Sequence, residues 1–79
     1  MQKQTYYMNK NMQEKSGDYE VHTNNCAHGA HEDNKLYLGD YYSCGPAVQE
    51  AIRLYSDQVT KLGGKINGCY WCCNPCHTG

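Results

Sequence analysis

The chain has no phenylalanine, and its 79 residues include only one tryptophan and two prolines. Its mean hydropathy of -0.87 is strongly polar, and its apolar residues include six cysteines and eight tyrosines, so aliphatic side chains are few. A domain of this size buries only about 60% of the surface that its unfolded chain exposes. Such domains usually need disulfides, a metal or a partner to stay folded. We therefore predict one domain, residues 1–79, that depends on a cross-link.

The sequence also lacks an excess of positive charge and any long apolar run. Seven Lys and Arg against eight Asp and Glu give a net charge of -1. Nucleic-acid binders usually carry a basic face, so charge does not favour a nucleic-acid partner, although it leaves one possible. No segment approaches the roughly 18 apolar residues of a membrane span. Residues 1–8 show no apolar core of a secretory signal, so we expect a cytoplasmic protein with no membrane partner.

The cysteines gather near the carboxyl end, since four of the six lie within residues 69–76. Cys69 and Cys72 form a Cys-x2-Cys pair, and far upstream His22 and Cys26 form a His-x3-Cys pair. Two short-spaced pairs, distant in sequence, are typical of a closed tetrahedral zinc site. We therefore predict that His22, Cys26, Cys69 and Cys72 bind a structural Zn²⁺, because thiols stay reduced in the cytosol.

Other assignments of the cysteines stay open. Cys73 and Cys76 form an overlapping Cys-x2-Cys pair that is followed by His77, and this alternative set competes for the metal. All six cysteines could instead pair as disulfides. At Cys44, close to the start of a predicted helix, we expect a small buried residue; the alternative is a thiol acidified by the helix N-terminus.

No catalytic constellation accompanies these residues. The acidic residues are dispersed, and no serine lies in a nucleophile-elbow context. Cys73-Asn-Pro-Cys76 resembles the motif of thiol oxidoreductases, but the chain ends too soon for the helix that this motif requires. A zinc ion with four protein ligands also has no open position for a substrate. We therefore expect no enzymatic activity.

The hydrophobic pattern predicts an α+β fold: a small antiparallel meander with one amphipathic helix and a zinc knot. Strands are expected over residues 5–8, 19–22 and 35–39, the first two as a hairpin. Residues 65–68 are expected to lead straight into the cysteine turn.

The helix is the clearest element of the sequence. Apolar residues recur at helical spacing from Val48 to Leu62 and form one continuous stripe. Ser43 is a suitable N-cap, and Gly63-Gly64 should end the helix because glycine adopts the left-handed conformation without strain.

The tyrosines are too numerous for the interior of so small a domain. One interpretation is that half of them replace phenylalanine in the core. The other is an aromatic contact surface, because tyrosine and tryptophan are enriched at protein interfaces. For that surface we predict Tyr41, Tyr42, Tyr70 and Trp71.

Several motifs, in order, resemble the metal-binding module of the Ada DNA-repair proteins: His22-x3-Cys26, Asn34-Lys-Leu-Tyr-Leu-Gly, Ser43-x3-Ala47-x3-Ala51 and Asn67-Gly-Cys69-x2-Cys72. The resemblance covers about residues 20–72 and implies the same zinc framework at His22, Cys26, Cys69 and Cys72. In the Ada family the first ligand is a cysteine that accepts a methyl group from a DNA phosphotriester. His22 stands at that position here, so this alkyl transfer does not carry over.

A second likeness extends over nearly the whole chain. A group of short bacterial proteins, frequent in Bacteroidetes, is similar in motifs that include Tyr6-Tyr7-x-Asn9-Lys10-Asn11, Gly17-Asp18-x-Glu20-Val21-His22, Ser43-Cys44, Gly68-Cys69-Tyr70-x-Cys72 and Cys76-His77-Thr78. This chain departs from the group by a longer connection over residues 58–65. The likeness implies a stable small fold and leaves the function open.

The function that we expect is a non-catalytic, zinc-stabilised module that binds another protein. One alternative is a phage or mobile-element inhibitor of a host defence nuclease, of the anti-CRISPR type, because a compact stapled protein suits that role. The other alternative is an Ada-like module that contacts DNA.

Overall fold

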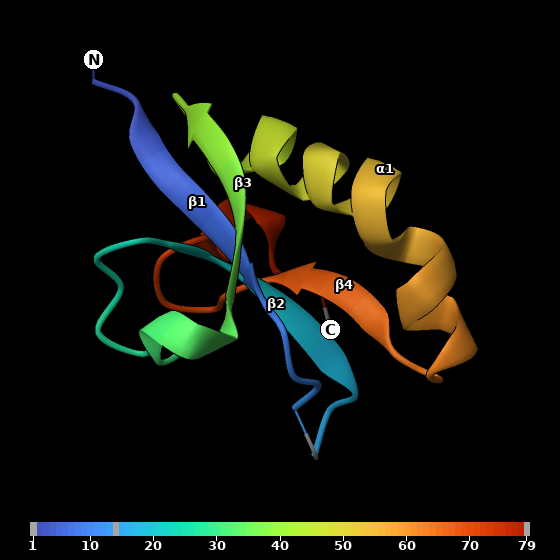
Figure 1. The fold of residues 1–79 in the computed structure, drawn as a ribbon. Helices are drawn as coiled ribbons and strands as arrows, with labels where there is room; N and C mark the ends of the chain where they lie inside the picture. Colours follow the sequence, from blue (N-terminus) through green and yellow to red (C-terminus); the bar gives the residue numbers. More distant parts are fainter. Residues whose placement is uncertain (1, 14, 79) are drawn as a thin grey trace.

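A four-stranded mixed sheet with one helix packed across it forms the body of the protein in a computed structural model that describes residues 2–13 and 15–78 (Figure 1). The elements are β1 (Gln4–Asn9), β2 (Asp18–Thr23), β3 (Lys35–Tyr41), α1 (Cys44–Lys61) and β4 (Lys65–Gly68), with short 3-10 turns at Glu32–Asn34 and Asn74–Cys76. The predicted α+β class and the amphipathic helix are confirmed. Within the described residues, no helix combines the length and the apolar character that crossing a membrane requires.

The strand order is β3-β1-β2-β4, which differs from that of a sequential meander. The predicted hairpin of β1 and β2 is present, with Tyr7 opposite His22. β3 pairs antiparallel with β1. Residues 65–68, which we expected to be a plain connection, form β4 and pair in parallel with β2. Four residues carry too little pattern to reveal a strand whose partner lies more than forty positions upstream.

The core lies between the sheet and α1. Its side chains from the sheet are Tyr6, Met8, Tyr19, Val21 and Leu38, and α1 adds Cys44, Ala47, Ala51 and Val59. Tyr6, Tyr7 and Tyr19 are all buried, so tyrosine does replace phenylalanine in part of the interior. The buried face of α1 is centred on its two alanines, whereas Ile52 and Leu62 of the expected stripe are exposed. Small side chains let the helix lie close to the sheet.

Both ends of α1 lie close to where the sequence predicts them. Ser43 is the N-cap residue, although its side chain makes no capping hydrogen bond. At the other end, Gly63 has a φ of 77°. Its N–H donates to Thr60 O at 3.0 Å, and the N–H of Gly64 donates to Val59 O at 3.0 Å. These two bonds form a Schellman motif, which satisfies carbonyls at the helix end and turns the chain toward β4.

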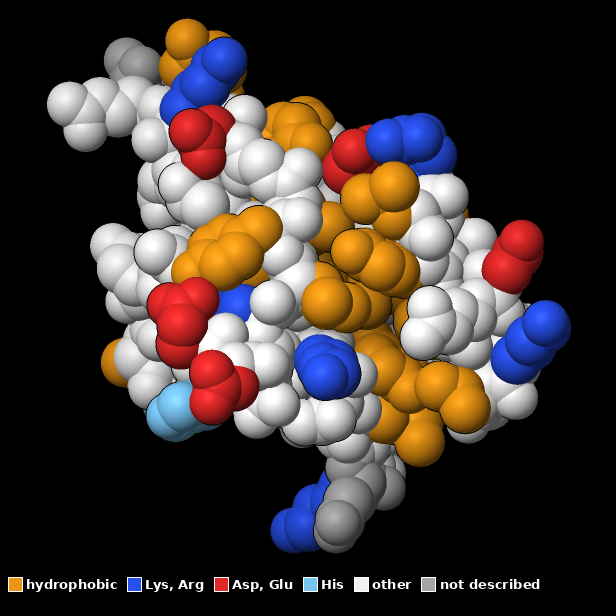
Figure 2. All heavy atoms as spheres, viewed as in Figure 1, with side chains coloured by type: hydrophobic (Ala, Val, Ile, Leu, Met, Phe, Trp, Pro, Cys, Tyr) orange, Lys and Arg blue, Asp and Glu red, His pale blue; other side chains and the backbone are white. Residues whose placement is uncertain are grey.

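Apolar side chains remain visible along the seam between the sheet and α1, as an orange band in Figure 2. The band includes a cavity of about 160 Å³ lined by Met8, Lys10, Tyr19, Leu36, Tyr55, Gln58, Val59 and Leu62. Leu62 at its rim is 58% exposed. The helix therefore covers the sheet incompletely, as expected of a chain with so few large aliphatic residues.

Asn67 in β4 ties the end of the chain to β2. Its side chain is buried, and its Nδ2 donates to Asp18 Oδ2 at 3.0 Å and to Thr78 O at 2.8 Å. Its Oδ1 accepts from the N–H of Thr78 at 2.9 Å. The other carboxylate oxygen, Asp18 Oδ1, has no hydrogen bond and lies 3.8 Å from Lys65 Nζ.

We predict that Asn67→Ala destabilises the fold by about 2–4 kcal/mol, because it removes the hydrogen bonds of the Asn67 side chain to Asp18 and Thr78 and leaves the Asp18 carboxylate buried without a hydrogen-bond donor. Urea unfolding of the variant and the parent measures the difference. Asn74→Ala is the control, since the Asn74 side chain is exposed and bonds only Tyr70 O, and we expect it to change stability much less. Equal stabilities for the two variants would contradict this role for Asn67.

Candidate metal centre

Parallel pairing of β2 and β4 brings together the two ligand pairs that the sequence predicts. The carboxyl ends of parallel strands lie at the same edge of a sheet. His22 is near the end of β2, and Cys26 lies in the loop that follows. Cys69 and Cys72 lie in the turn that follows β4, whose last residue is paired with Val21. Sheet topology thus brings His22 and Cys26 within reach of residues more than forty positions away.

The geometry of the four side chains fits a tetrahedral metal. The ligand atoms of His22, Cys26, Cys69 and Cys72 all lie within 4.8 Å of one another. Cys26 Sγ is 3.9 Å from Cys69 Sγ, and Cys72 Sγ is 3.8 Å from His22 Nδ1. Corners about 2.3 Å from a central zinc would be separated by about 3.8 Å. This Cys3His cluster could therefore hold a metal ion such as zinc.

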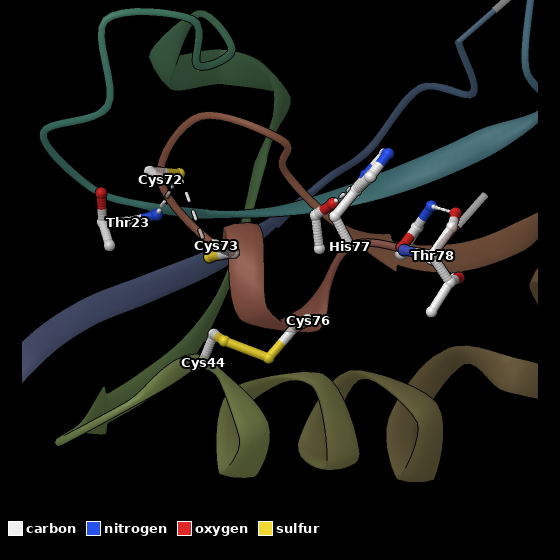
Figure 3. The surroundings of a disulfide bond; sticks show 9 residues. Thr23, Cys44, Cys72, Cys73, Cys76, His77 and Thr78 are labelled. Carbon is white, nitrogen blue, oxygen red and sulfur yellow. Dashed lines mark hydrogen bonds between the residues drawn. A yellow bond between two sulfur atoms is a disulfide. The ribbon is translucent and has the colours of Figure 1, made fainter.

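The site is largely shielded from water and surrounded by backbone donors. His22 and Cys69 are each 1% exposed, whereas Cys26 and Cys72 are half-buried. The N–H of Thr23 donates to Cys72 Sγ at 3.3 Å (Figure 3). Such donors stabilise sulfur in its thiolate form, which is the form that binds metals.

Burial disfavours the charged forms of three of the four side chains, as the pKa shifts of Cys69, Cys26 and His22 show. Burial raises the pKa of the Cys69 thiol, and backbone N–H groups of Trp71 and Cys72 oppose this effect without cancelling it. Burial also raises the pKa of Cys26. For His22, burial lowers the pKa to about 4, and the positive charges of nearby groups add to the effect. His22 is therefore a neutral imidazole at neutral pH, as a metal ligand must be, and a bound cation would favour the thiolate forms of Cys26 and Cys69.

The alternative ligand set is not brought together. Cys76 forms a disulfide with Cys44 (Figure 3). Cys73 is fully buried, and burial together with the neighbouring Cys72 raises its pKa to about 12. His77 directs Nδ1 to Gly68 O, 2.9 Å away. The prediction that Cys73, Cys76 and His77 form a competing metal site is therefore wrong in this structure, because one of its thiols is bonded elsewhere.

The disulfide also settles two other interpretations of the cysteines. Cys44 is buried, as predicted, but it is bonded to Cys76 and carries no reactive thiol. Complete pairing of the six cysteines is wrong as well, because Cys26, Cys69, Cys72 and Cys73 are free. The protein thus has both kinds of cross-link that its composition suggested, one covalent and one suited to a metal.

Tyr7 supports the loop that carries Cys26, a role that no pattern in the sequence indicated. The side chain is fully buried, and its ring centroid lies 5.3 Å from that of His22. The Tyr7 hydroxyl oxygen accepts a hydrogen bond from the N–H of Ala30 at 2.7 Å. A Cβ at Gly29 would collide with this hydroxyl, so the loop can pass here only as glycine. Tyr7 therefore fixes the position of the loop beside the metal ligands.

The four aromatic residues predicted to bind a partner fall into two separate pairs. Tyr70 and Trp71 lie between the ligands Cys69 and Cys72, and they are 53% and 65% exposed. Tyr42 is also exposed, with Lys3 above its ring. Tyr41 instead packs on Tyr6 and donates its hydroxyl to Leu38 O at 2.9 Å. Its ring is thus part of the fold and is poorly placed for a partner.

Two histidines flank the exposed pair, Tyr70 and Trp71, in the turn that follows β4. The His28 ring stacks on Trp71 with centroids 4.7 Å apart. The His77 ring meets the edge of Tyr70 at 5.5 Å, and Tyr70 and Trp71 are themselves nearly perpendicular. We call His28, Tyr70, Trp71 and His77 the aromatic cluster. Tyr70 and Trp71 lie between Cys69 and Cys72 of the Cys3His cluster. A metal bound by these two cysteines would therefore fix the backbone that presents the aromatic cluster.

No family model, no curated protein and no solved structure matches the chain. The resemblances to the Ada module and to the Bacteroidetes group therefore stay expectations from the motifs alone.

Proposed function

We propose that the protein is a non-catalytic module that is stabilised by zinc and binds another protein. The observation that carries the proposal is the convergence of four ligand atoms within 4.8 Å of one another. Three thiols and one imidazole are the donors of a structural zinc site, and four protein ligands leave no position for substrate or water. The metal would hold the turn after β4 against the end of β2, where the small apolar core contributes little stabilisation.

The aromatic cluster supports the binding role. Exposed tyrosine and tryptophan in a fixed orientation lose little conformational entropy on binding, and both are enriched among residues that dominate interface energies. Trp71 is the most exposed large side chain of this kind, at 65%. A net charge of -1 favours a protein over a nucleic acid, whose phosphates are bound mainly through basic side chains.

We predict that Trp71→Ala weakens the binding of a protein partner by at least about 30-fold, the loss typical of a dominant interface residue. Partners captured by the parent are identified by mass spectrometry, and their affinities are then measured with each variant. Tyr42→Ala is the matched control, because Tyr42 is equally exposed but lies outside the aromatic cluster. Zinc content should be the same in all three proteins.

Other outcomes point to other surfaces. If the Trp71→Ala variant kept its affinity for the partner and a Leu62→Asp variant lost it, the interface would lie at the cavity beside α1 instead. If the protein bound duplex DNA at low salt and its affinity fell steeply as the salt concentration rose, the Ada-like alternative would be favoured over a protein-binding module.

The cytoplasmic location expected from the sequence stays a prediction, and the Cys44–Cys76 disulfide weighs against it. Disulfides persist in oxidising compartments and are rare in the cytosol. Rapid alkylation of free thiols in intact cells, followed by mass spectrometry of Cys44 and Cys76, distinguishes the two compartments.

A further inference from the structure

We propose that Glu20 is the residue that positions His22, so that the imidazole binds the metal through Nδ1 and donates its Nε2–H to the Glu20 carboxylate. This proposal rests on the zinc site proposed above and adds to it a residue outside the four ligands. Metal-binding histidines commonly donate their second ring nitrogen to a carboxylate, which fixes the ring and raises its basicity as a ligand.

The strand itself places the two residues together. Glu20 and His22 are two positions apart in β2, and alternate residues of a strand project from the same face. His22 Nε2 lies 3.5 Å from Glu20 Oε1. The other nitrogen, Nδ1, lies 3.8 Å from Cys72 Sγ. The two nitrogens thus face different groups, one the Glu20 carboxylate and the other the Cys72 thiol.

The two contacts together define the tautomer. A neutral imidazole has one N–H and one lone pair, and the hydrogen bond made by one nitrogen determines which of the two binds metal. A carboxylate can only accept, so the nitrogen facing Glu20 is the one that carries the proton. The lone pair then lies on Nδ1, the nitrogen that faces Cys72 Sγ. At 3.5 Å the present contact is longer than a hydrogen bond of about 2.7–3.2 Å, and a small shift of either side chain closes it.

Glu20 is itself held in place. Its side chain is only 14% exposed, and its Oε1 accepts from Gln13 Nε2 at 2.8 Å. This bond comes from the turn before β2 and limits the positions that the carboxylate can take. His22 is packed equally tightly, since it is 1% exposed and lies against the Tyr7 ring. Packing therefore holds both side chains close to each other before a metal arrives, and only the short movement that closes the 3.5 Å contact remains.

The test measures zinc affinity by competition with a chelator in the parent, Glu20→Gln and Glu20→Ala. We expect a loss of about 10–100-fold, with alanine at the larger end. Glu50→Gln is the control that matches the change of charge, because Glu50 lies on α1 and pairs with Arg53. It should leave zinc affinity unchanged.

A second measurement separates positioning from a general effect on the fold. In the zinc-bound parent, NMR should show His22 ligated through Nδ1, with an Nε2–H proton shifted downfield by the charged acceptor. In Glu20→Gln that proton should move upfield while the backbone spectrum stays the same. Unchanged affinity in both Glu20 variants, or reduced affinity with an unchanged Nε2–H signal, would overturn the proposal. A parent that binds no zinc at all would instead remove the proposed function.

Discussion

Replacing Cys69 with serine should release the metal and unfold the domain. Cys69 is 1% exposed and belongs to the Cys3His cluster, so the substitution removes one of the three thiols that would bind the metal. A structural zinc site contributes roughly 10–16 kcal/mol of apparent binding free energy, which is folding free energy when the apo chain is unfolded. That is as large as the roughly 5–15 kcal/mol of net stability of most domains, so loss of the metal can remove the whole stability of the fold. Elemental analysis and circular dichroism of the purified variant measure the two losses.

Cys73→Ala is the matched control, because Cys73 is also fully buried but lies outside the cluster. It should keep one zinc per chain and lose only the packing of one sulfur. Removing zinc from the parent with a strong chelator should reproduce the unfolding seen in Cys69→Ser. If the Cys73 variant lost zinc and the Cys69 variant kept it, the assignment of ligands would be wrong.

The second large effect is expected from the disulfide. The double variant Cys44→Ser/Cys76→Ser should lose about 3–4 kcal/mol of stability, since the bond joins residues separated by 32 positions and restricts the unfolded chain. The bond also ties the first residue of α1 to the turn beyond the metal ligands, a region with little apolar contact of its own. Urea unfolding of the zinc-bound proteins, without reductant, measures this difference.

Reductant supplies the control for the disulfide. Under conditions that leave zinc bound, reducing the parent should lower its stability to that of the double variant, whose own stability should not change. Both proteins should contain one zinc per chain, because Cys44 and Cys76 are not among the four ligands. A parent that reductant leaves equally stable would show that the disulfide adds nothing to the fold.

Local patterns were enough to predict several parts of this protein. Spacing made His22, Cys26, Cys69 and Cys72 the preferred ligand set, because the members of each pair have only two or three residues between them, but it left Cys73, Cys76 and His77 open as an alternative. The helix was predictable because apolar residues recur at helical spacing over several turns and two glycines follow its end, the first at a φ of 77°. The hairpin of β1 and β2 was predictable because its strands are neighbours in sequence.

Other features depend on contacts between distant segments, and no local pattern encodes them. The alternation of Glu20 and His22 was visible in the sequence, but only the fold shows that His22 turns one nitrogen to Glu20 and the other to Cys72. The choice between Cys76 as a ligand and as a disulfide partner likewise depended on where α1 begins.

The sequence by itself determined the type of fold and the helix, and it limited the candidate metal ligands to a few short-spaced pairs, because each follows from the spacing of neighbouring residues. Only the tertiary structure decided that β4 pairs in parallel with β2, and that this pairing places both donor pairs at one edge of the sheet. The physical reason is that strand pairing and sulfur partners are chosen by which segments can be buried against each other, a property of the whole chain.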